Sequence, residues 1–386
     1  MPDTATTIDD LLAPLVAFRR DLHSHPELGF KEHRTSALIA DALREIGLEV
    51  HTGIGGTGVV GVLRAGSSGR SVGLRADMDA LPIQEETGLP HASRNAGVFH
   101  GCGHDGHVAM LLGAARHLAR TRRFDGTVNF IFQPAEEGLG GAREMVKDGL
   151  FARFPCDRVF ALHNWPDLPA GTVATRPGPI MAAADKFQIT VEGRGAHAAM
   201  PHRTPDAILA ASDLVGQLNT IVSRRIPPLS SAVLSVTRIE GGHSHNVLPA
   251  AVRLTGTVRT FDPAVQDTVE AAVRQVAEGV ALASGTTVTV DYDRYYPATL
   301  NDAGAAAEAL EAAAAVAEHA VQAPEPAFTS EDFAFMLQAC RGAYLWLGQG
   351  TDGSVPLHHP RYDFNDAVLA QGIRLHAALA ERTLRT

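Results

Sequence analysis

The chain has 386 residues, 45% of them hydrophobic and 20% charged, and a formal net charge of −10. This length allows two or three globular domains, and the acidic balance argues against a nucleic-acid partner, which needs a basic face. Three cysteines are too few for a disulfide framework, no apolar run predicts a membrane span and no signal-peptide pattern is present, so we expect a cytoplasmic protein that acts on a small molecule.

The first part of the chain, up to about residue 183, alternates helical and strand patterns. Helical apolar spacing is found in three segments: 8–25, 35–46 and 108–119. Apolar, β-branched runs predict four strands: 59–63, 72–76, 127–132 and 158–162. This alternation is typical of an α/β fold, and we expect an α/β/α domain with a mixed sheet.

From Lys186 onward the predicted elements follow a different order. They are a strand at 187–192, a helix at 206–224, strands at 232–239 and 252–260, a helix at 265–283 and a strand at 287–292. This is the β-α-β-β-α-β order of a ferredoxin-like α+β unit. A helix at 303–321, a strand at 344–347 and a helix at 366–384 then return to the first pattern. We therefore expect one α/β domain, residues 1–184 and 297–386, interrupted by an α+β domain, residues 185–296.

A thiol and three imidazoles crowd into the eight residues from His100 to His107. Cysteine thiolate and neutral imidazole are preferred ligands of zinc and related ions, and the neighbouring glycines allow the backbone to aim Cys102 and His104 at one point. The run lacks the paired CxxC or HxxxH spacing of a closed structural site. Further ligands must therefore come from elsewhere in the chain.

Three later segments offer such ligands. Glu136 and Glu137 follow a buried predicted strand, His163 follows another, and His358 lies in a loop next to proline. In parallel α/β sheets the carboxyl ends of strands are where sites assemble. Because consecutive side chains diverge, one of the two glutamates can bind metal while the other accepts a proton from water.

Four polar residues beside these motifs are ambiguous. We expect His107, at a helix start, to hydrogen-bond rather than bind metal, and His359 to take a loop role. Asp77 and Asp79 end a predicted strand, where Asp79 could orient a ligand imidazole. Capping of the strand end is the alternative for both carboxylates.

Two further motifs have ordinary explanations. The run from Gly53 to Gly58 matches the dinucleotide fingerprint GxGxxG, but residues 59–63 predict a strand, whereas the fingerprint opens a helix. We interpret the run as a turn between two strands, and a nicotinamide oxidoreductase built on it is a rival hypothesis. Glu331 and Asp332 are expected to cap the helix that follows them, without a chemical role.

Ten motifs together resemble the M20 metallopeptidase family, in the amidohydrolase branch of hippurate hydrolases, auxin-conjugate hydrolases and other N-acyl-amino acid amidohydrolases. They run almost from end to end: HSHPELGFKEHRTS at 23–36, LRADMDALPI at 74–83, HGCGHDGHVAMLLG at 100–113, FQPAEEGLGGAREMVKDGLF at 132–151, HNWPDLPAGTV at 163–173, GRGAHAAMPHRTPDAI at 193–208, GGHSHNVLP at 241–249, GTVRTFD at 256–262, TSEDFAF at 329–335 and LHHPRYDFND at 357–366. So many motifs in one order are highly specific.

The resemblance implies a hydrolase that cleaves the amide bond of N-acyl-amino acids to a carboxylic acid and a free amino acid, with two divalent ions per subunit. Five residues would hold the ions: Cys102 as a bridge, His104, Glu137, His163 and His358. Glu136 would be the general base towards water activated at the metals. Thiolate and imidazole suit zinc, and the carboxylate positions are also compatible with manganese, cobalt or nickel.

The resemblance further implies that the inserted domain is the lid and dimerisation domain of a homodimer. His197 would stabilise an oxyanion and reach the partner's active site, Asn246 would donate a hydrogen bond, and Arg259 would hold the substrate carboxylate. The alternative is that all three are ordinary strand-end and surface residues. No motif identifies the acyl group, so an N-acetyl-amino acid deacetylase of the acetyl-diaminopimelate type or a dipeptidase of the same family is the alternative function. A noncatalytic metal-binding protein is the rival from another class.

Overall fold

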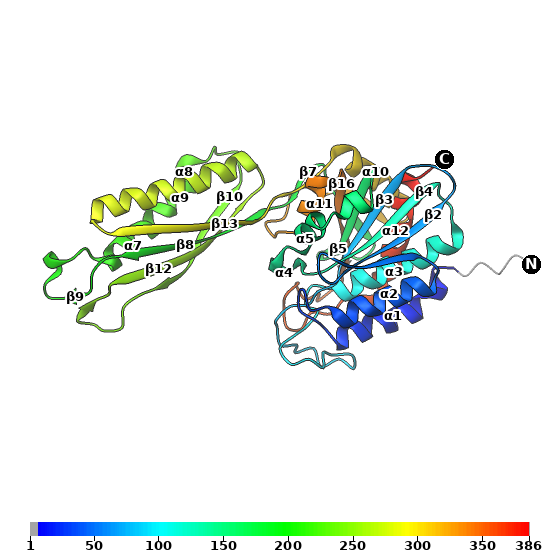
Figure 1. Cartoon of the computed structure of the whole chain (residues 1–386), viewed down its shortest axis with the longest axis horizontal. Coiled ribbons are helices and arrows are strands. Elements are labelled where there is room, and N and C mark those ends of the chain that lie inside the picture. Colours follow the sequence, from blue (N-terminus) through cyan, green and yellow to red (C-terminus); the bar gives the residue numbers. More distant parts are fainter. Residues whose placement is uncertain (1–6, 386) are drawn as a thin grey trace, which may run out of the picture. The chain divides into compact units, whose positions relative to one another are not determined.

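The computed structural model describes residues 7–385 and divides the chain into two compact units (Figure 1). Unit 1 comprises Met1–Ile180, Leu300–Glu325 and Asp332–Thr386, and unit 2 comprises Met181–Thr299 and Pro326–Glu331. The return of residues 326–331 to unit 2 has no counterpart in the sequence patterns. Within residues 7–385, no helix is both long and apolar enough to cross a membrane.

Unit 1 is built on an eight-stranded mixed sheet with the order β1-β2-β4-β3-β5-β16-β6-β15. Its strands are β1 (Glu49–Ile54), β2 (Gly58–Ala65), β3 (Ser71–Asp77), β4 (Gly126–Gln133), β5 (Arg158–Pro169), β6 (Thr172–Thr175), β15 (His319–Gln322) and β16 (Gly342–Gly350). The neighbours β4, β3, β5 and β16 are parallel, so their carboxyl ends share one edge of the sheet. Every residue of β3 is buried, as expected for a strand covered on both faces.

Helices cover both faces of this sheet. They are α1 (Asp9–Ser24), α2 (His33–Glu45), α3 (His104–Thr121), α4 (Glu136–Leu139), α5 (Gly141–Lys147), α6 (Leu150–Arg153), α10 (Ala303–Ala314), α11 (Ala334–Ala339) and α12 (Leu369–Thr383), with a 3-10 turn η2 (Asp366–Val368). Leu74 and Leu345 belong to the apolar core that includes α3 and α12. Their neighbours Arg75 and Tyr344 point to the other face and contact Phe333, beside α11. The predicted α/β/α domain with a mixed sheet is confirmed.

Helix α3 is buried on all sides along its first three turns, because residues 104–115 are small or apolar apart from His104, Asp105 and His107. Two glycines let other segments approach it closely. A side-chain carbon at Gly106 would lie 2.4 Å from the ring of Phe364, and one at Gly113 would lie 2.6 Å from Ile373 of α12. The start of α3 is therefore fixed against the C-terminal part of the chain.

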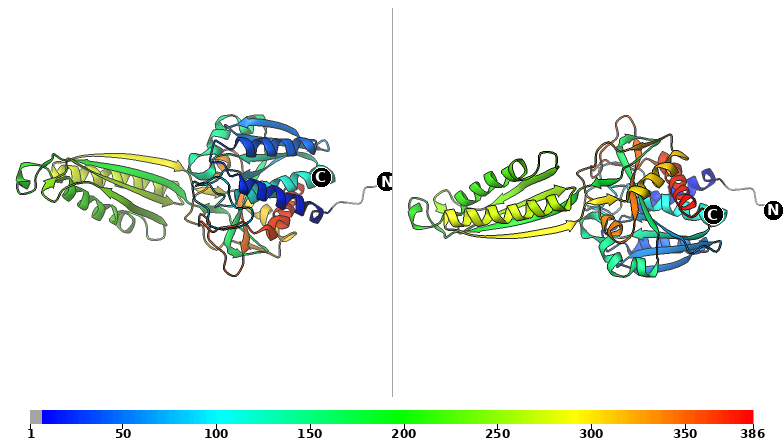
Figure 2. Two further views of the ribbon diagram at one scale, coloured as in Figure 1. Left: turned by 90° about the horizontal axis from the view of Figure 1, so that it is seen from below. Right: turned by 90° about the horizontal axis from the view of Figure 1, so that it is seen from above.

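Unit 2 contains an antiparallel sheet with the order β10-β12-β8-β13. The strands are β8 (Ala183–Glu192), β10 (Ala232–Glu240), β12 (Ala251–Thr260) and β13 (Thr287–Tyr296), and the helices are α7 (Ala207–Leu218), α8 (Thr220–Arg225) and α9 (Pro263–Ser284). Buried and exposed residues alternate along β12, and Figure 2 shows α7 and α9 on the same face of the strands. The predicted β-α-β-β-α-β order is therefore present.

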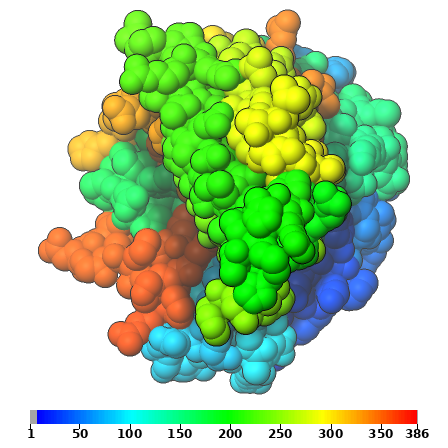
Figure 3. Space-filling model, turned by 90° about the vertical axis from the view of Figure 1, so that its left-hand side faces the viewer, coloured from blue at the N-terminus to red at the C-terminus, as the bar shows by residue number. Residues whose placement is uncertain are grey.

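Shorter elements complete the two units. They are β9 (Ala196–His197), paired with β11 (Val247–Leu248), the turn η1 (Pro201–Arg203), and β7 (Gly178–Met181), paired with β14 (Thr299–Asn301). Figure 3 shows the segment around β9 and η1, in bright green, and the outer surface of α9, in yellow, exposed on unit 2. The glycine run Gly53–Gly58 lies where β1 turns into its antiparallel partner β2, as predicted.

Several predicted boundaries are wrong, and the helix at 108–119, for example, begins at His104. The strand at 158–162 does not stop before His163, because β16 continues to supply main-chain partners as far as Pro169. The helix at 303–321 ends at Ala314, and the following β15 pairs with β6, so strand pairing overrides the helix propensity of alanine. The helix at 206–224 is divided into α7 and α8 at Asn219.

Candidate metal centre

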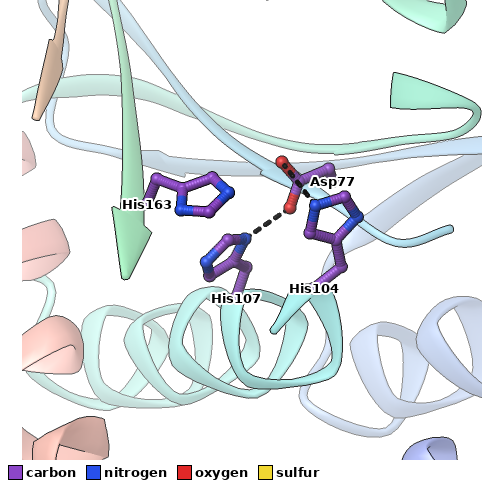
Figure 4. Close-up of side chains that lie close together, drawn as sticks. All are labelled: Asp77, His104, His107 and His163. Atoms are coloured by element: carbon purple, nitrogen blue, oxygen red, sulfur yellow. Dashed lines mark hydrogen bonds and ion pairs between the residues drawn. The ribbon is translucent and has the colours of Figure 1, made fainter. Parts of the chain in front are cut away.

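Four buried side chains from three elements converge at the edge of the unit 1 sheet (Figure 4). Asp77 ends β3, His104 and His107 stand on the first turn of α3, and His163 extends from β5. Each offers a ligand atom, and these four atoms all lie within 4.8 Å of one another. His104 and His107 point the same way because residues three apart on a helix share a face.

A second group of ligand atoms adjoins the first. One atom each from Cys102, Glu137 and His358 lies within 4.8 Å of the others, and His358 Nε2 is 3.3 Å from Glu137 Oε1. Cys102 Sγ is also 3.4 Å from His163 Nε2, and His104 Nε2 is 4.0 Å from Glu137 Oε1. The structure therefore brings all five expected ligands together. Cys102 is buried whereas the His358 side chain is 51% exposed, so the centre opens to solvent on the His358 side.

The backbone at this centre adopts left-handed conformations at three decisive positions. Gly103, with φ +89°, directly precedes α3, and a side chain there would meet Asn164 and Tyr362. Ala135 and His358 also have positive φ, 54° and 64°. For a residue other than glycine this conformation costs about 1–2 kcal/mol, and it persists only where the surrounding structure enforces it.

Asp79 joins the two glutamates to a ligand imidazole. Its Oδ1 accepts a hydrogen bond from the Glu136 N–H and its Oδ2 accepts one from the Glu137 N–H, both at 3.0 Å. Oδ1 also lies 3.3 Å from His104 Nδ1. Glu32, which the sequence patterns did not identify, holds the preceding peptide by accepting from the Ala135 N–H at 2.9 Å. The turn that carries Glu136 and Glu137 is thus held by two buried carboxylates.

His107 and His359 make hydrogen bonds within the protein. The two ring nitrogens of His107 contact Asp77 and Asn164, and the Asn164 amide donates to the Tyr362 hydroxyl at 2.8 Å. His359 is exposed, and its Nδ1 accepts from the Arg361 N–H at 3.1 Å. Both arrangements fit supporting roles.

Glu136 is buried and lies next to the ligands. One of its carboxylate oxygens lies within 4.8 Å of ligand atoms of both His104 and Glu137, and Oε1 accepts from the Asp332 N–H at 3.3 Å. The expectation that Glu331 and Asp332 cap the next helix is wrong, since α11 begins without a side-chain cap.

The Asp332 carboxylate serves a different purpose. Its Oδ1 accepts from Gln133 at 2.7 Å and from Arg75 at 3.2 Å, and its Oδ2 accepts from the Ala142 N–H of α5 at 2.9 Å. Those partners lie about 190 to 260 positions earlier in the chain, which is why no local pattern revealed this role.

Carboxylates surround the candidate ligands, and this negative charge favours a bound cation. Burial, and then the nearby Glu137, Glu136 and Asp77, hold the pKa of Cys102 well above its usual value. Burial, and then His107, hold the pKa of His163 well below its usual value. Burial would lower the pKa of His104, but Asp77 and Asp79 outweigh it and raise that pKa to about 10.

The donor atoms fit a divalent metal. The buried atoms without a hydrogen-bond partner among the described residues include both ring nitrogens of His104 and Oε1 of Glu137. His104 Nδ1 lies 3.3 Å from Asp79 Oδ1, and Glu137 Oε1 lies 3.3 Å from His358 Nε2, in both cases without hydrogen-bond geometry. Buried polar atoms are normally paired, so such orphans indicate a missing ligand. Thiolate, imidazole and carboxylate are the donors that zinc and related ions take in proteins.

Sequence reasoning gave His107 a hydrogen-bonding role beside the ligands and left Asp77 open between a site residue and a strand-end cap. The spacing of His104 and His107 was an available signal, because an i, i+3 pair on a helix faces one side. For Asp77 no local signal separates a site carboxylate from a strand-end cap. Its position becomes clear only when β3 and α3 are seen together (Figure 4).

The three expected functional residues of unit 2 do not form one cluster there. His197 pairs with Val247 in the β9–β11 ladder, and the Ala198 N–H donates to the Asn246 carbonyl at 3.0 Å, so His197 and Asn246 are neighbours and both are exposed. Arg259 stands at the other end of β12, opposite Ala184 of β8. Its guanidinium donates to the Val258 carbonyl and to the Thr257 hydroxyl.

Comparison with known proteins gives the family. Residues 73–382 match peptidase family M20/M25/M40. The chain belongs to this family. A hippurate hydrolase from Campylobacter jejuni is 40% identical over 382 residues, covering 97% of this chain and 98% of that protein. An N-acetyl-L-cysteine deacetylase from Bacillus subtilis is 40% identical over 371 residues, covering 96% and 88%.

A solved structure agrees with this membership. A dinuclear metal-binding peptidase of the M20 family from Bacillus subtilis superposes with a TM-score of 0.84 at 36% identity, covering 98% of this chain and 99% of that one. The resemblance to the amidohydrolase branch is confirmed, and this M20 chain is a hydrolase of amide bonds. The glycine run opens no helix, so the fingerprint of a nicotinamide oxidoreductase is incomplete.

Proposed function

We propose that this M20 chain is a metal-dependent amidohydrolase that cleaves N-acyl-amino acids to a carboxylic acid and a free amino acid. Two divalent ions would be held by five residues: Cys102, His104, Glu137, His163 and His358. The observation that carries the proposal is the convergence of these donors around the orphaned atoms of His104 and Glu137. Zinc fits the thiolate and imidazoles, and manganese, cobalt or nickel also fit the carboxylate positions.

The bound ions would supply Lewis acidity, which lowers the pKa of a water molecule and polarises the amide carbonyl. Glu136 would take the proton from that water and return it to the leaving amine. Its carboxylate is close enough for this role, because it shares the 4.8 Å neighbourhood of His104 and Glu137. Asp79 would fix the turn on which the two glutamates stand, because its carboxylate accepts hydrogen bonds from both of their N–H groups.

Asp77 and His107 would support the ligands rather than bind the ions. Their mutual hydrogen bond, and the bond from His107 to Asn164, occupy groups that a ligand would have to free. Hydrogen-bond partners of this kind fix the orientation and the tautomer of ligand imidazoles.

Unit 2 would act as lid and dimerisation domain in a homodimer. His197 would stabilise the oxyanion in the partner's active site, Asn246 would donate a hydrogen bond to the substrate, and Arg259 would hold the carboxylate of the amino-acid product. The positions of the two residues support this division. His197 lies on β9, beyond the end of β8 that pairs with the start of β12, whereas Arg259 lies near the end of β12, so the two do not meet on one copy of unit 2.

The size of the acyl group separates the two candidate substrates. The hippurate hydrolase relative is named for a benzoyl substrate, and the deacetylase relative is named for an acetyl one. An N-acetyl-amino acid deacetylase or a dipeptidase is therefore the alternative within the same chemistry.

Metal removal tests the proposal. Protein stripped with a chelator should lose hydrolysis of hippurate, N-acetyl-amino acids and aromatic acyl conjugates alike, and should recover it when one divalent ion is restored. Metal analysis of the protein as purified should find two ions per chain. Full activity in metal-free protein would falsify the proposal. Tight metal binding without any amide hydrolysis would favour the noncatalytic rival.

A further inference from the structure

A buried arginine on α1 lies outside the proposed reaction. The side chain of Arg19 has no exposed surface. Its Nη1 lies 2.8 Å from Asp363 Oδ1 and 3.2 Å from Asp105 Oδ2, and its Nε lies 2.9 Å from Asp366 Oδ1. Burying a charge is costly unless it is paired and hydrogen-bonded, and this guanidinium is shared by three carboxylates.

These carboxylates belong to the two segments that carry the candidate ligands His104 and His358. Asp105 is the second residue of α3, directly after His104. Asp363 and Asp366 follow His358 in the C-terminal segment. Arg19 therefore joins the helix that carries one ligand to the segment that carries another.

Arg19 shares the anchoring of the C-terminal segment with other buried groups. The hydroxyl of the buried Tyr362 accepts from Asn164 at 2.8 Å and from Gln349 at 3.1 Å. The His358 N–H donates to the Gly101 carbonyl at 2.8 Å, and the ring of Phe364 rests on Gly106 of α3. The same ring lies 5.9 Å from the Arg19 guanidinium carbon. Residues 351–354 are exposed, so the loop that leads into His358 gains little from burial.

His358 itself needs support. Its backbone has φ +64°, and half of its side chain is exposed. A ligand in a left-handed conformation holds its position only when the surrounding structure enforces it. The guanidinium of arginine spreads five donors over a rigid planar fork, whereas the ammonium group of lysine has three rotatable donors on one atom, so only arginine can reach carboxylates that lie apart in fixed directions.

We propose that Arg19 is a positioning residue of the metal centre, which ties the start of α3 to the segment 358–366 and thereby fixes His358 beside Cys102 and Glu137. The inference rests on the proposed metal centre. It applies to one of the two ions only, since His163 and His104 are held by β5 and α3 themselves. Loss of a supporting partner typically weakens metal affinity 10- to 100-fold.

The test compares three full-length variants with the wild-type protein. Arg19→Lys keeps the charge and removes the fork. Arg20→Lys is the matched control, because Arg20 also donates to Asp366, at 2.8 and 3.0 Å, but its side chain is 48% exposed and these are its hydrogen bonds to the segment 358–366. His358→Ala defines the behaviour of a protein that has lost this ligand outright.

Two readouts besides activity decide the matter. Competition with a chelator gives the dissociation constant of each ion, and the visible spectrum of the cobalt-loaded protein reports the ligands of each ion. We expect Arg19→Lys to weaken one ion 10- to 100-fold, to leave the other unchanged, and to alter the cobalt spectrum in the direction of His358→Ala. Arg20→Lys should behave like the wild type.

Other results would overturn the inference. If Arg19→Lys holds both ions as the wild type does, or weakens both equally with a lower melting temperature, Arg19 is only a structural residue. If that variant does not fold, Asp363→Asn takes its place, since it removes one anchor and leaves Arg19 paired with Asp105 and Asp366. Wild-type protein that holds no divalent ion would instead contradict the proposed function.

Discussion

Unit 1 and unit 2 hold their candidate functional residues in different ways. In unit 1, Asp77 and Asp79 are buried and hydrogen-bonded to groups from other segments of the chain, and the buried His104 lies beside Asp79. In unit 2, His197 and Asn246 are exposed on a short two-stranded ladder, and Arg259 lies at the far end of another strand. The first arrangement is preorganised, whereas the second is not a site by itself.

This difference separates binding of the metals from turnover. A preorganised set of ligands needs no help from unit 2 to bind ions, because its donors already converge. The exposed His197 and Asn246 and the half-buried Arg259, which lie apart in unit 2, acquire a role only when a substrate or another subunit meets them. Substitutions in the two units should therefore affect different measurements.

The largest effect is expected at the two adjacent glutamates of unit 1. Glu136→Gln should lower kcat by about two or more orders of magnitude with metal content near that of the wild type, since a general base contributes that much. Glu137→Gln should lose metal as well, because it removes a charged ligand. Metal analysis beside steady-state kinetics checks both. If the two variants exchange these behaviours, the base and the ligand are reversed.

A loss of about 100-fold in kcat is expected for His197→Ala, the typical cost of removing one oxyanion donor. Metal content should not change, since His197 is not a ligand. Mixed with Glu136→Gln under subunit exchange, the variant should regain part of its activity, because one hybrid site then contains an intact Glu136 and an intact partner histidine.

The control for that experiment is proof that heterodimers form, for example by native mass spectrometry. If they form without any gain in activity, His197 acts within its own subunit or not at all. The metal chemistry of unit 1 would stand in either case.

A smaller effect is expected at the other end of the unit 2 sheet. Arg259→Lys should raise KM for N-acyl-amino acids about 10- to 100-fold, because a paired charge-assisted hydrogen bond contributes about 1.5–3 kcal/mol. Substrates whose carboxylate is replaced by an amide should be cleaved equally by wild type and variant. An equal loss on both substrates would show that Arg259 supports the fold of β12 instead.

The smallest effect concerns stability and belongs to unit 1. Burial alone would lower the pKa of His23, but Asp105, at 2.8 Å, and Glu85 outweigh it and raise that pKa to about 9. A raised pKa stabilises the fold fully below the unfolded value of about 6.5, and the contribution is lost as the pH rises towards 9.

His23→Gln should therefore lower the free energy of unfolding at pH 6 by a few kcal/mol at most, as measured by urea denaturation. The gap in this free energy between variant and wild type should shrink by pH 9.5. His197→Gln, the same change at an exposed position, should show no such pH-dependent gap. A gap for His23→Gln that stays constant across this range would show that the pair contributes through packing rather than charge.

What the sequence revealed depends on how local each signal is. Helix α9 was predicted to within two residues at its start, because Asp262 caps it, Pro263 opens it and the pattern between is amphipathic. The wrong end of α10 has the opposite origin, since only pairing of β15 with β6 reveals that the alanines after residue 314 leave the helix.

The same distinction holds for the candidate centre. The five expected ligands stand in recognisable motifs, and the structure brings them together. Glu32 stands within the motif at 23–36, yet its role and that of Arg19 were not predicted. Their supporting contacts lie far away in the chain, 103 positions for Ala135 and more than 340 for Asp363 and Asp366. Local patterns identify groups that meet a ligand, and they miss the groups that hold those residues in place.

The position of β16 in the sheet determines when unit 1 can finish folding during synthesis. Strand β6 ends at Thr175, yet both of its neighbours, β16 and β15, are made only after the whole of residues 181–299. During synthesis β6 therefore lacks both neighbouring strands while unit 2 is being translated, and unpaired strand edges favour aggregation. A truncation before residue 342 removes the whole of β16 and leaves a gap between β5 and β6, in the interior of the sheet rather than at its edge.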